Sequence, residues 1–278
     1  MNKFAILINP TKTHNYNKVK QLLISIKNKY TFYSIHEKET EFFPKISKTS
    51  EIEALLVFGG DGTVLHSAKY AIKYGVPIFG VNIGSLGFLT ETKLFELLKA
   101  LEKLKKDRFT IQSRILLNVS VIRNKKKLFS ANALNDVVIF RGFTAKMITI
   151  NFYVNRLFVF TTKSDGMIIT TPTGSTGYSL SAGGPLLSPT MEAFVVTPLH
   201  PHTLTARPMV FSYEDQFSFK IKGAHKDSVL QVDGENLFSL DEDDLINIKR
   251  ANVKIGFVKL LNRTYYQILR EKLHLGRR

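Results

Sequence analysis

The stretch that decides the fold is Phe58-Gly59-Gly60-Asp61-Gly62-Thr63, which lies between an apolar run and a run that suits a helix. The apolar run, residues 54–58, has the length and composition of a buried β-strand, and residues 64–74 are compatible with a helix. The glycines therefore fall on a strand-to-helix turn. In an open α/β sheet ligands bind at this edge, because backbone N–H groups and a helix N-terminus face an anion there.

Asp61 is the residue in this turn that needs a chemical explanation. Glycines let backbone N–H groups approach a phosphate closely, whereas a carboxylate repels it. The combination therefore indicates that Asp61 acts as a base or as a metal partner. The alternative is a tight turn without function, since Gly and Asp are common turn residues.

The composition bounds the class of protein. The chain has 278 residues, of which 44% are hydrophobic and 22% charged, which is typical of one large or two modest globular domains. With no Cys, a disulfide framework, a thiolate metal site and a Cys nucleophile are excluded. No apolar run is long enough to span a bilayer, so we expect a cytoplasmic protein with no membrane partner.

The net charge of +16 would concentrate polyanions around the protein. The basic residues are spread along the chain, and the densest cluster, residues 123–127, has the pattern of a solvated hairpin tip. Zinc-finger spacing and an aromatic-basic RNA-binding signature are both missing from the sequence. We therefore expect no nucleic-acid partner, and a nucleotide-handling enzyme explains the charge.

The first part of the chain, residues 1–108, predicts a Rossmann-like α/β domain, because strand and helix patterns alternate there. The leucines at 94, 97, 98, 101 and 104 form one apolar helical face and are expected in the core. Strands are expected at residues 4–9, 31–36, 54–58 and 77–82, and helices at residues 16–29, 64–74 and 92–106.

The pattern then changes, and residues 109–252 predict a second, β-rich domain. Asn155-Arg156 has the length of a two-residue hairpin turn. The C-terminal residues 253–278 are expected to pack back on the first domain. Strands of the β-rich domain are expected at residues 116–123, 127–131, 137–141, 147–154, 157–162, 217–222 and 229–232.

Three further motifs indicate chemistry. A second glycine loop, residues 82–89, follows the fourth strand, so two parallel strands end in glycine loops. The pair Asn135-Asp136 can donate and accept hydrogen bonds at adjacent points, as a ribose or base edge requires, although a simple turn stays open. Residues 163–185 are rich in small and hydroxylic residues that would expose many donors to a flat ligand, and a flexible loop is the alternative.

Taken together, these motifs resemble the NAD kinase family. The resemblance covers about residues 55–235 and rests on motifs in the family's order. These motifs are Gly59-Gly60-Asp61-Gly62-Thr63, Gly84-Ser85-Leu86-Gly87-Phe88, Asn135-Asp136, Asp165-Gly166, Thr171-Pro172-Thr173-Gly174-Ser175-Thr176, Tyr178, Ser181-Ala182-Gly183-Gly184-Pro185, Pro201-His202 and Asp233-Gly234.

The resemblance implies an N-terminal α/β domain, a C-terminal β-sandwich-like domain, and a homodimer or homotetramer. It implies transfer of the γ-phosphoryl group of ATP, or of inorganic polyphosphate, to the adenosine 2′-hydroxyl of NAD. It also implies a divalent cation, Mg²⁺ or Mn²⁺, for which the sequence indicates no ligands.

The resemblance also assigns site residues. Asp61 would be the general base, and the donor phosphates would lie against Gly59, Gly60, Gly62 and Thr63. The implied NAD-binding residues are Asp61, Gly62, His66, Phe88, Asn135, Asp136, Lys146, Lys163, Asp165, Thr176, Gly177, Tyr178 and Ser181. Three positions depart from the commonest family pattern: Asp136 replaces Glu, Lys163 replaces Arg, and Gly177 replaces Ala.

Two rival functions remain at this point. Lipid kinases and sugar-type kinases share the Gly-Gly-Asp-Gly loop, but lipid kinases usually carry a Gly-Thr-x-Asn-Asp segment where this chain has residues 84–88. A non-catalytic dinucleotide-binding protein would be favoured if Asp61 were replaced, and Asp61 is present.

Overall fold

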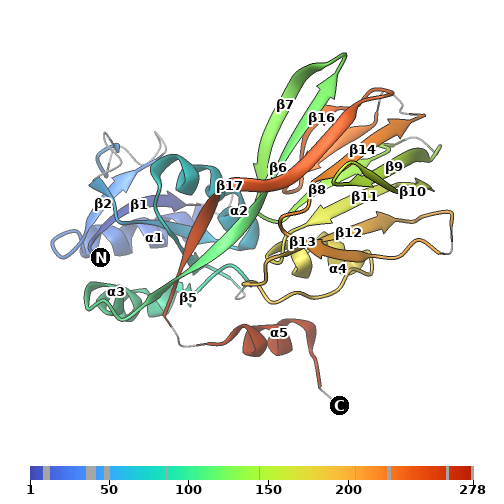
Figure 1. Ribbon diagram of the computed structural model, residues 1–278. Helices are drawn as coiled ribbons and strands as arrows, with labels where there is room; N and C mark the ends of the chain where they lie inside the picture. The colour runs from blue at the N-terminus through green and yellow to red at the C-terminus, as the bar shows by residue number, and fades with distance from the viewer. Residues whose placement is uncertain are drawn as a thin grey trace. The chain divides into compact units, whose positions relative to one another are not determined.

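A computed structural model describes residues 1–8, 13–35, 42–46, 51–84, 87–143, 145–203, 205–223, 227–260 and 263–276. The chain forms two compact units (Figure 1). We call residues 1–113 with 255–278 the α/β unit, and residues 114–254 the β-rich unit. Among the helices in the described ranges, none is long and apolar enough to cross a bilayer.

The α/β unit is built on a parallel sheet with the strand order β17-β4-β3-β1-β2. Its strands are almost continuously apolar because a parallel sheet is covered on both faces, and β3 is buried along its whole length. The short strand β5 pairs with β4. The bounds are β1 (Lys3–Ile8), β2 (Thr31–Ser34), β3 (Ala54–Gly59), β4 (Ile78–Asn82), β5 (Thr92–Lys93) and β17 (Leu245–Lys259).

The helices of this unit are α1 (Thr13–Ser25), α2 (Asp61–Tyr74), α3 (Leu97–Lys105) and α5 (Tyr265–Leu273). Helix α2 packs against β3 and β4 and ends at Gly75, whose φ of 64° is the left-handed conformation that glycine favours. Helix α5 begins at a capping box in which Thr264 and Gln267 each accept a hydrogen bond from the other's backbone N–H.

Three helix starts differ from the sequence prediction. Helix α1 begins at Thr13, not at residue 16. Helix α2 begins at Asp61, not at residue 64, so the carboxylate lies in the first helical turn, where the helix dipole favours a negative charge. Helix α3 begins at Leu97, because residues 92–93 pair with β4 and Leu94–Glu96 form a 3₁₀ turn. Leu98 was predicted to be in the core and is 46% exposed, since it lies outside the narrower apolar face of the shorter helix.

The β-rich unit is a sandwich of two antiparallel sheets. One contains β10, β9, β14 and β17 in that order, with β6 pairing β17 and β7, and the other has the order β13-β12-β11-β8-β15-β16. One apolar cluster joins the two sheets, with Phe152 and Phe219 from one side and Ile139 and Ile169 from the other. The bounds are β6 (Thr110–Arg123), β7 (Lys126–Ala133), β8 (Asp136–Phe140), β9 (Ile148–Val154), β10 (Leu157–Ser164), β11 (Gly166–Thr170), β12 (Ala193–Leu199), β13 (Met209–Ser212), β14 (Phe217–Lys222), β15 (Val229–Val232) and β16 (Glu235–Ser239).

The predicted fold class, α/β followed by a β-sandwich, is confirmed. The hairpin turn at Asn155-Arg156 is also confirmed, with φ values of 50° and 70° between β9 and β10. A short 3₁₀ turn, η4 (Gly174–Thr176), and the one-turn helix α4 (Tyr178–Ser181) follow β11.

Candidate active site

The first glycine loop leaves open space at the start of α2. Strand β3 ends at Gly59, and Gly60 precedes the helix in an extended conformation. A Cβ on Gly59 would lie 2.2 Å from Oγ1 of Thr63, so packing requires glycine there. A Cβ on Gly60 or Gly62 would meet no atom within 4 Å. The fold therefore does not require glycine at these two positions, whereas the close approach of a phosphate would.

The carboxylate of Asp61 is held by the second glycine loop. Its Oδ2 accepts the N–H of Phe88 at 2.8 Å, and its Oδ1 accepts the N–H of Leu89 at 3.0 Å. A Cβ on Gly87 would lie 1.9 Å from Oδ1 of Asp61, so the backbone passes directly against the carboxylate. Each oxygen has a second lone pair, so the oriented carboxylate can still accept a proton. Residues 85 and 86 of this loop lie outside the described residues.

Two residues that the sequence analysis did not identify support this loop. Oδ1 of Asn82 accepts the N–H of Gly84 at 2.6 Å, and Oγ1 of Thr90 accepts the N–H of Gly87 at 2.9 Å. Nδ2 of Asn82 also donates to Oγ1 of Thr90 at 3.3 Å. Asn82 ends the buried strand β4, and a polar residue at that position of a parallel strand is the signal that could have identified it.

His66 lies one turn along α2 and is exposed. Its ring centroid is 6.3 Å from that of Tyr70 on the same helix. The structure joins Asp61 and Phe88 directly, and His66 lies on the same helix as Asp61.

In the β-rich unit, Asn135 and Asp136 lie on a loop whose backbone N–H groups all point at one carboxylate. Asp233 accepts the N–H of Leu134 at 2.9 Å, of Asn135 at 2.7 Å and of Asp136 at 3.2 Å. From the other side, Oγ1 of Thr171 donates to the Leu134 carbonyl at 2.6 Å. Side chains distant in sequence therefore satisfy the polar backbone of this loop.

The side chain of Asn135 has an unused acceptor. Its Oδ1 is buried and has no hydrogen-bond partner among the described residues. A Cβ on Gly177 would lie 3.7 Å from Nδ2 of Asn135, and a Cβ on Gly174 would lie 2.3 Å from the backbone carbonyl oxygen of Asn135. A buried acceptor without a donor costs stability, so it indicates a donor on a ligand.

The buried Asp136 carboxylate lies close enough to the partly buried Asp233 carboxylate to feel its charge. Burial raises the pKa of Asp136 to about 7, and the charge of Asp233 adds to this effect. Burial also raises the pKa of Asp233, but its three backbone N–H donors oppose that shift. Burial therefore favours the protonated form of Asp136.

The raised pKa of Asp136 predicts that Asp136→Asn stabilises the folded protein, and that the gain in stability depends on pH. The folded-state pKa of about 7 lies above the unfolded value near 3.8, so the native state loses stability as pH rises between these values. An Asn does not titrate, and the variant should therefore be more stable than the wild type by a few kcal/mol at pH 8 and by almost nothing near pH 4. Urea unfolding at both pH values measures this, and an equal difference at both would contradict it.

Most hydroxyls of residues 163–185 are not exposed donors, which corrects the sequence analysis. Thr170, Thr171, Ser175 and Ser179 are fully buried, and the first three donate to backbone carbonyls. Buried hydroxyls must be satisfied internally, and they make the segment rigid. Three predicted NAD-binding residues that carry a hydroxyl remain accessible on this segment, namely the partly exposed Thr176 and the exposed Tyr178 and Ser181.

Asp165, a predicted ligand-binding residue, is already engaged by two side chains. Its carboxylate accepts the Nε–H of Arg141 at 2.6 Å and lies 3.1 Å from Nδ1 of His200. The sequence analysis identified neither partner. Lys146 and Lys163, two further predicted NAD-binding residues, are exposed.

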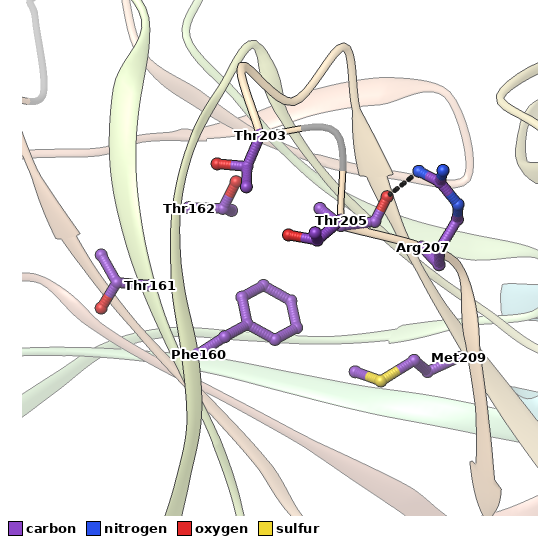
Figure 2. A pocket seen from close by; sticks show the side chains of 8 residues that line it. Phe160, Thr161, Thr162, Thr203, Thr205, Arg207 and Met209 are labelled. Carbon is purple, nitrogen blue, oxygen red and sulfur yellow. Dashed lines mark hydrogen bonds between the residues drawn. The ribbon is translucent and has the colours of Figure 1, made fainter.

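A separate cavity of about 170 Å³ lies elsewhere in the β-rich unit (Figure 2). None of the predicted site residues lines it. Leu204, which follows the lining residue Thr203, lies outside the described residues. We therefore assign the cavity no ligand. It is lined by Phe160, Thr161, Thr162, Thr203, Thr205, Ala206, Arg207 and Met209.

The described part of the chain contains no cluster of three or more His, Asp or Glu side chains that could hold a metal ion. The described His, Asp and Glu side chains therefore do not fit a metal site made by the protein alone. A divalent cation would need oxygen ligands from substrate phosphates.

Comparison with known protein families identifies the chain. The ATP-NAD kinase N-terminal domain matches residues 7–109, and the ATP-NAD kinase C-terminal domain matches residues 134–260. The chain belongs to the NAD kinase family. It is 41% identical over 224 residues to the NAD kinase of Thermoanaerobacter sp. (strain X514), covering 81% of this chain and 79% of that protein. It is 41% identical over 228 residues to the NAD kinase of Geotalea daltonii, covering 82% and 80%. These relatives are phosphotransferases that act on an alcohol group.

Solved NAD kinase structures share the fold. A yeast NADH kinase complexed with NADH superposes with a TM-score of 0.85 at 23% identity, covering 100% of this chain and 89% of that one. An NAD kinase from Archaeoglobus fulgidus in complex with ATP gives 0.70 at 24% identity, covering 98% of both chains.

Proposed function

We propose that this chain phosphorylates NAD at the adenosine 2′-hydroxyl with ATP as donor and releases NADP and ADP. The observation that carries the proposal is the oriented carboxylate of Asp61 in the first turn of α2, between two glycine positions that the fold leaves open. Membership of the NAD kinase family supports the reaction, and related structures bind NADH and ATP.

We further propose a division of labour between the units. The α/β unit binds the phosphates of ATP at Gly59, Gly60, Gly62 and Thr63, where N–H groups and a helix N-terminus favour an anion. The β-rich unit binds NAD. It corresponds to the β-rich domain that the sequence predicts at residues 109–252. Its proposed NAD-binding residues are Asn135, Asp136, Lys146, Lys163, Asp165, Thr176, Gly177, Tyr178 and Ser181, to which the α/β unit adds Asp61, Gly62, His66 and Phe88.

Asp61 acts as the general base. It takes the proton of the 2′-hydroxyl as the oxygen bonds to the γ-phosphorus, and the bond from that phosphorus to the ADP oxygen breaks. A divalent cation, Mg²⁺ or Mn²⁺, would neutralise charge on the phosphates when bound. The hydrogen bonds from Phe88 and Leu89 hold the carboxylate so that its free lone pairs face the hydroxyl.

The test is ATP-dependent formation of NADP by the purified protein. With ATP as donor, NADP should form only when a divalent cation is present. A second reaction with inorganic polyphosphate in place of ATP shows whether polyphosphate also serves as donor. Phosphorylation of a diacylglycerol or a sugar without NADP formation would favour the lipid- or sugar-kinase alternative. Tight NAD binding without turnover would favour a non-catalytic dinucleotide-binding protein.

Asn135→Ala is expected to raise KM for NAD by about 5–150-fold and to leave KM for ATP nearly unchanged. The buried Oδ1 of Asn135 awaits a donor, and a lost hydrogen bond in a closed site costs about 1–3 kcal/mol. Steady-state kinetics with each substrate varied in turn measures both constants. Equal effects on both would mean that Asn135 has a structural role only.

We also propose that the protein forms a homodimer or homotetramer through the β-rich unit. Strand β10 lies at an edge of its sheet and exposes Leu157 by 73% and Phe158 by 59%. An exposed apolar edge strand is prone to pair with another chain.

Leu157→Lys should therefore shift the protein towards monomer in sedimentation at micromolar concentration. Leu128→Lys is the matched control, because Leu128 is an exposed apolar residue on β7, at 48%. High salt should leave the assembly intact, since it screens charges but not apolar contacts. A wild-type monomer with full activity would rule the proposal out.

A further inference from the structure

A second functional element of the β-rich unit is the turn between β15 and β16. It consists of Asp233 and Gly234, both left-handed, with φ values of 52° and 83°. A two-residue hairpin turn of this kind favours Asp or Asn followed by Gly, so its sequence is explained by the turn alone. The turn does not explain the direction of the Asp233 carboxylate, because a turn does not require that side chain to face the loop before β8.

The Asp233 carboxylate is the anchor of residues 134–136. It accepts three successive N–H groups at 2.9, 2.7 and 3.2 Å, and the N–H of Asp233 donates to the Asp136 carbonyl at 3.0 Å. On the opposite side, Oγ1 of Thr170 donates to the Asn135 carbonyl at 2.9 Å. With its backbone held from both sides, the loop has a fixed direction for the Asn135 and Asp136 side chains.

We propose that Asp233 is a positioning residue for NAD: by holding the backbone of residues 134–136 it aims Asn135 and Asp136 at the dinucleotide. The inference rests on the proposed function and adds to it a residue that does not touch the substrate. A hydrogen-bonding side chain discriminates only when its own position is fixed by its surroundings, which is the task that Asp233 performs.

Asp233 also acts on Asp136 through its charge. The pKa of Asp136 is raised first by burial and then by Asp233. Asp233 itself lies near Glu235 at the start of β16, and the strand on the other side, β11, presents the neutral Thr170 opposite Asp136. Removing the charge at position 233 should therefore lower the pKa of Asp136.

Asp233→Asn is the first test. Asn tolerates the left-handed turn, but its amide offers one acceptor oxygen where the carboxylate offers two, so at least one of the three N–H groups loses its partner. KM for NAD should rise about tenfold, and KM for ATP should change by less than about twofold. The affinity for NAD measured by calorimetry without ATP should fall by the same factor. KM for NAD should also be measured as a function of pH, and the midpoint of that dependence should move to lower pH in the variant.

Asp243→Asn is the matched control. Asp243 is an exposed left-handed aspartate of the same unit, with a φ of 61°, and it lies outside the proposed binding residues. The same chemical change there should leave both KM values and the pH midpoint unchanged. A second variant, Asp233→Gly, keeps the left-handed turn and removes the whole side chain, so it should raise KM for NAD further than Asp233→Asn.

The outcomes separate this inference from the proposed function. If Asn135→Ala raises KM for NAD and neither Asp233 variant does, the positioning role is wrong and the NAD site stands. If the Asp233 variants raise the KM values for NAD and ATP equally, or lower only the melting temperature, the residue is structural and the inference is overturned. If Asn135→Ala also leaves KM for NAD unchanged, the assignment of the NAD site itself has failed.

Discussion

Asp61→Asn is expected to lower kcat by about 10²–10⁴-fold while KM for NAD stays within a few-fold of the wild type. A sugar hydroxyl is a poor nucleophile until its proton is removed, and Asn has the shape of Asp without a basic oxygen. Kinetics at saturating ATP and NAD, together with the pH dependence of kcat, measures the effect.

The contacts of Asp61 add a condition to this test. The carboxylate accepts N–H groups from both Phe88 and Leu89, and the Asn amide can accept from only one side. The variant therefore removes a base and loosens a loop. A melting temperature close to the wild-type value, with kcat reduced, would assign the loss to the base. A variant with wild-type kcat would show that Asp61 is not the base.

Gly87→Ala should lower kcat by about 10²-fold without changing any charge. Its Cβ would lie 1.9 Å from Oδ1 of Asp61, so the carboxylate must move. A displacement of about 1 Å in a catalytic group is enough for a loss of this size. The backbone at Gly87 lies outside the left-handed region, so the substitution acts through this contact and not through backbone strain.

Gly84→Ala is the matched control, since it is the same substitution in the same loop. Its Cβ would meet only Oδ1 of Asn82, at an ordinary 3.8 Å, and kcat should stay near the wild-type value. Combining Gly87→Ala with Asp61→Asn should cost little more than Asp61→Asn alone, because both act on one carboxylate. Equal losses in the two alanine variants would assign the effect to the loop and not to Asp61.

The candidate-site residues of the α/β unit were largely predictable from sequence. The glycine turn follows a strand directly, so its place at the carboxyl end of β3 depends only on neighbouring residues. The start of α2 was placed three residues late, because an acidic residue in the first turn and the glycine before it resemble a loop. The contact between Asp61 and residues 88–89 was not predictable, since it depends on β3 and β4 being neighbours in the sheet.

The hydroxylic segment shows the limit of composition as a guide. Its small and hydroxylic residues predicted an accessible surface of donors, and six of its hydroxyl-bearing residues are buried instead. Composition indicates that donors exist, and packing decides whether they face a ligand or a carbonyl group. Thr170 thus supports Asn135, 35 residues away along the chain, and Thr171 supports Leu134, 37 residues away.

The sequence by itself determined the alternation of strands and helices in the first part of the chain, the glycine turn with its carboxylate, and the pair Asn135-Asp136, because propensity, periodicity and turn chemistry act over a few residues. Only the tertiary structure decided how those groups are held. Asp233 reaches the backbone of residues 134–136 from 97 to 99 positions along the chain, and burial beside it raises the pKa of Asp136. Such contacts depend on how strands pair and sheets stack, and their desolvation exists only after both have formed.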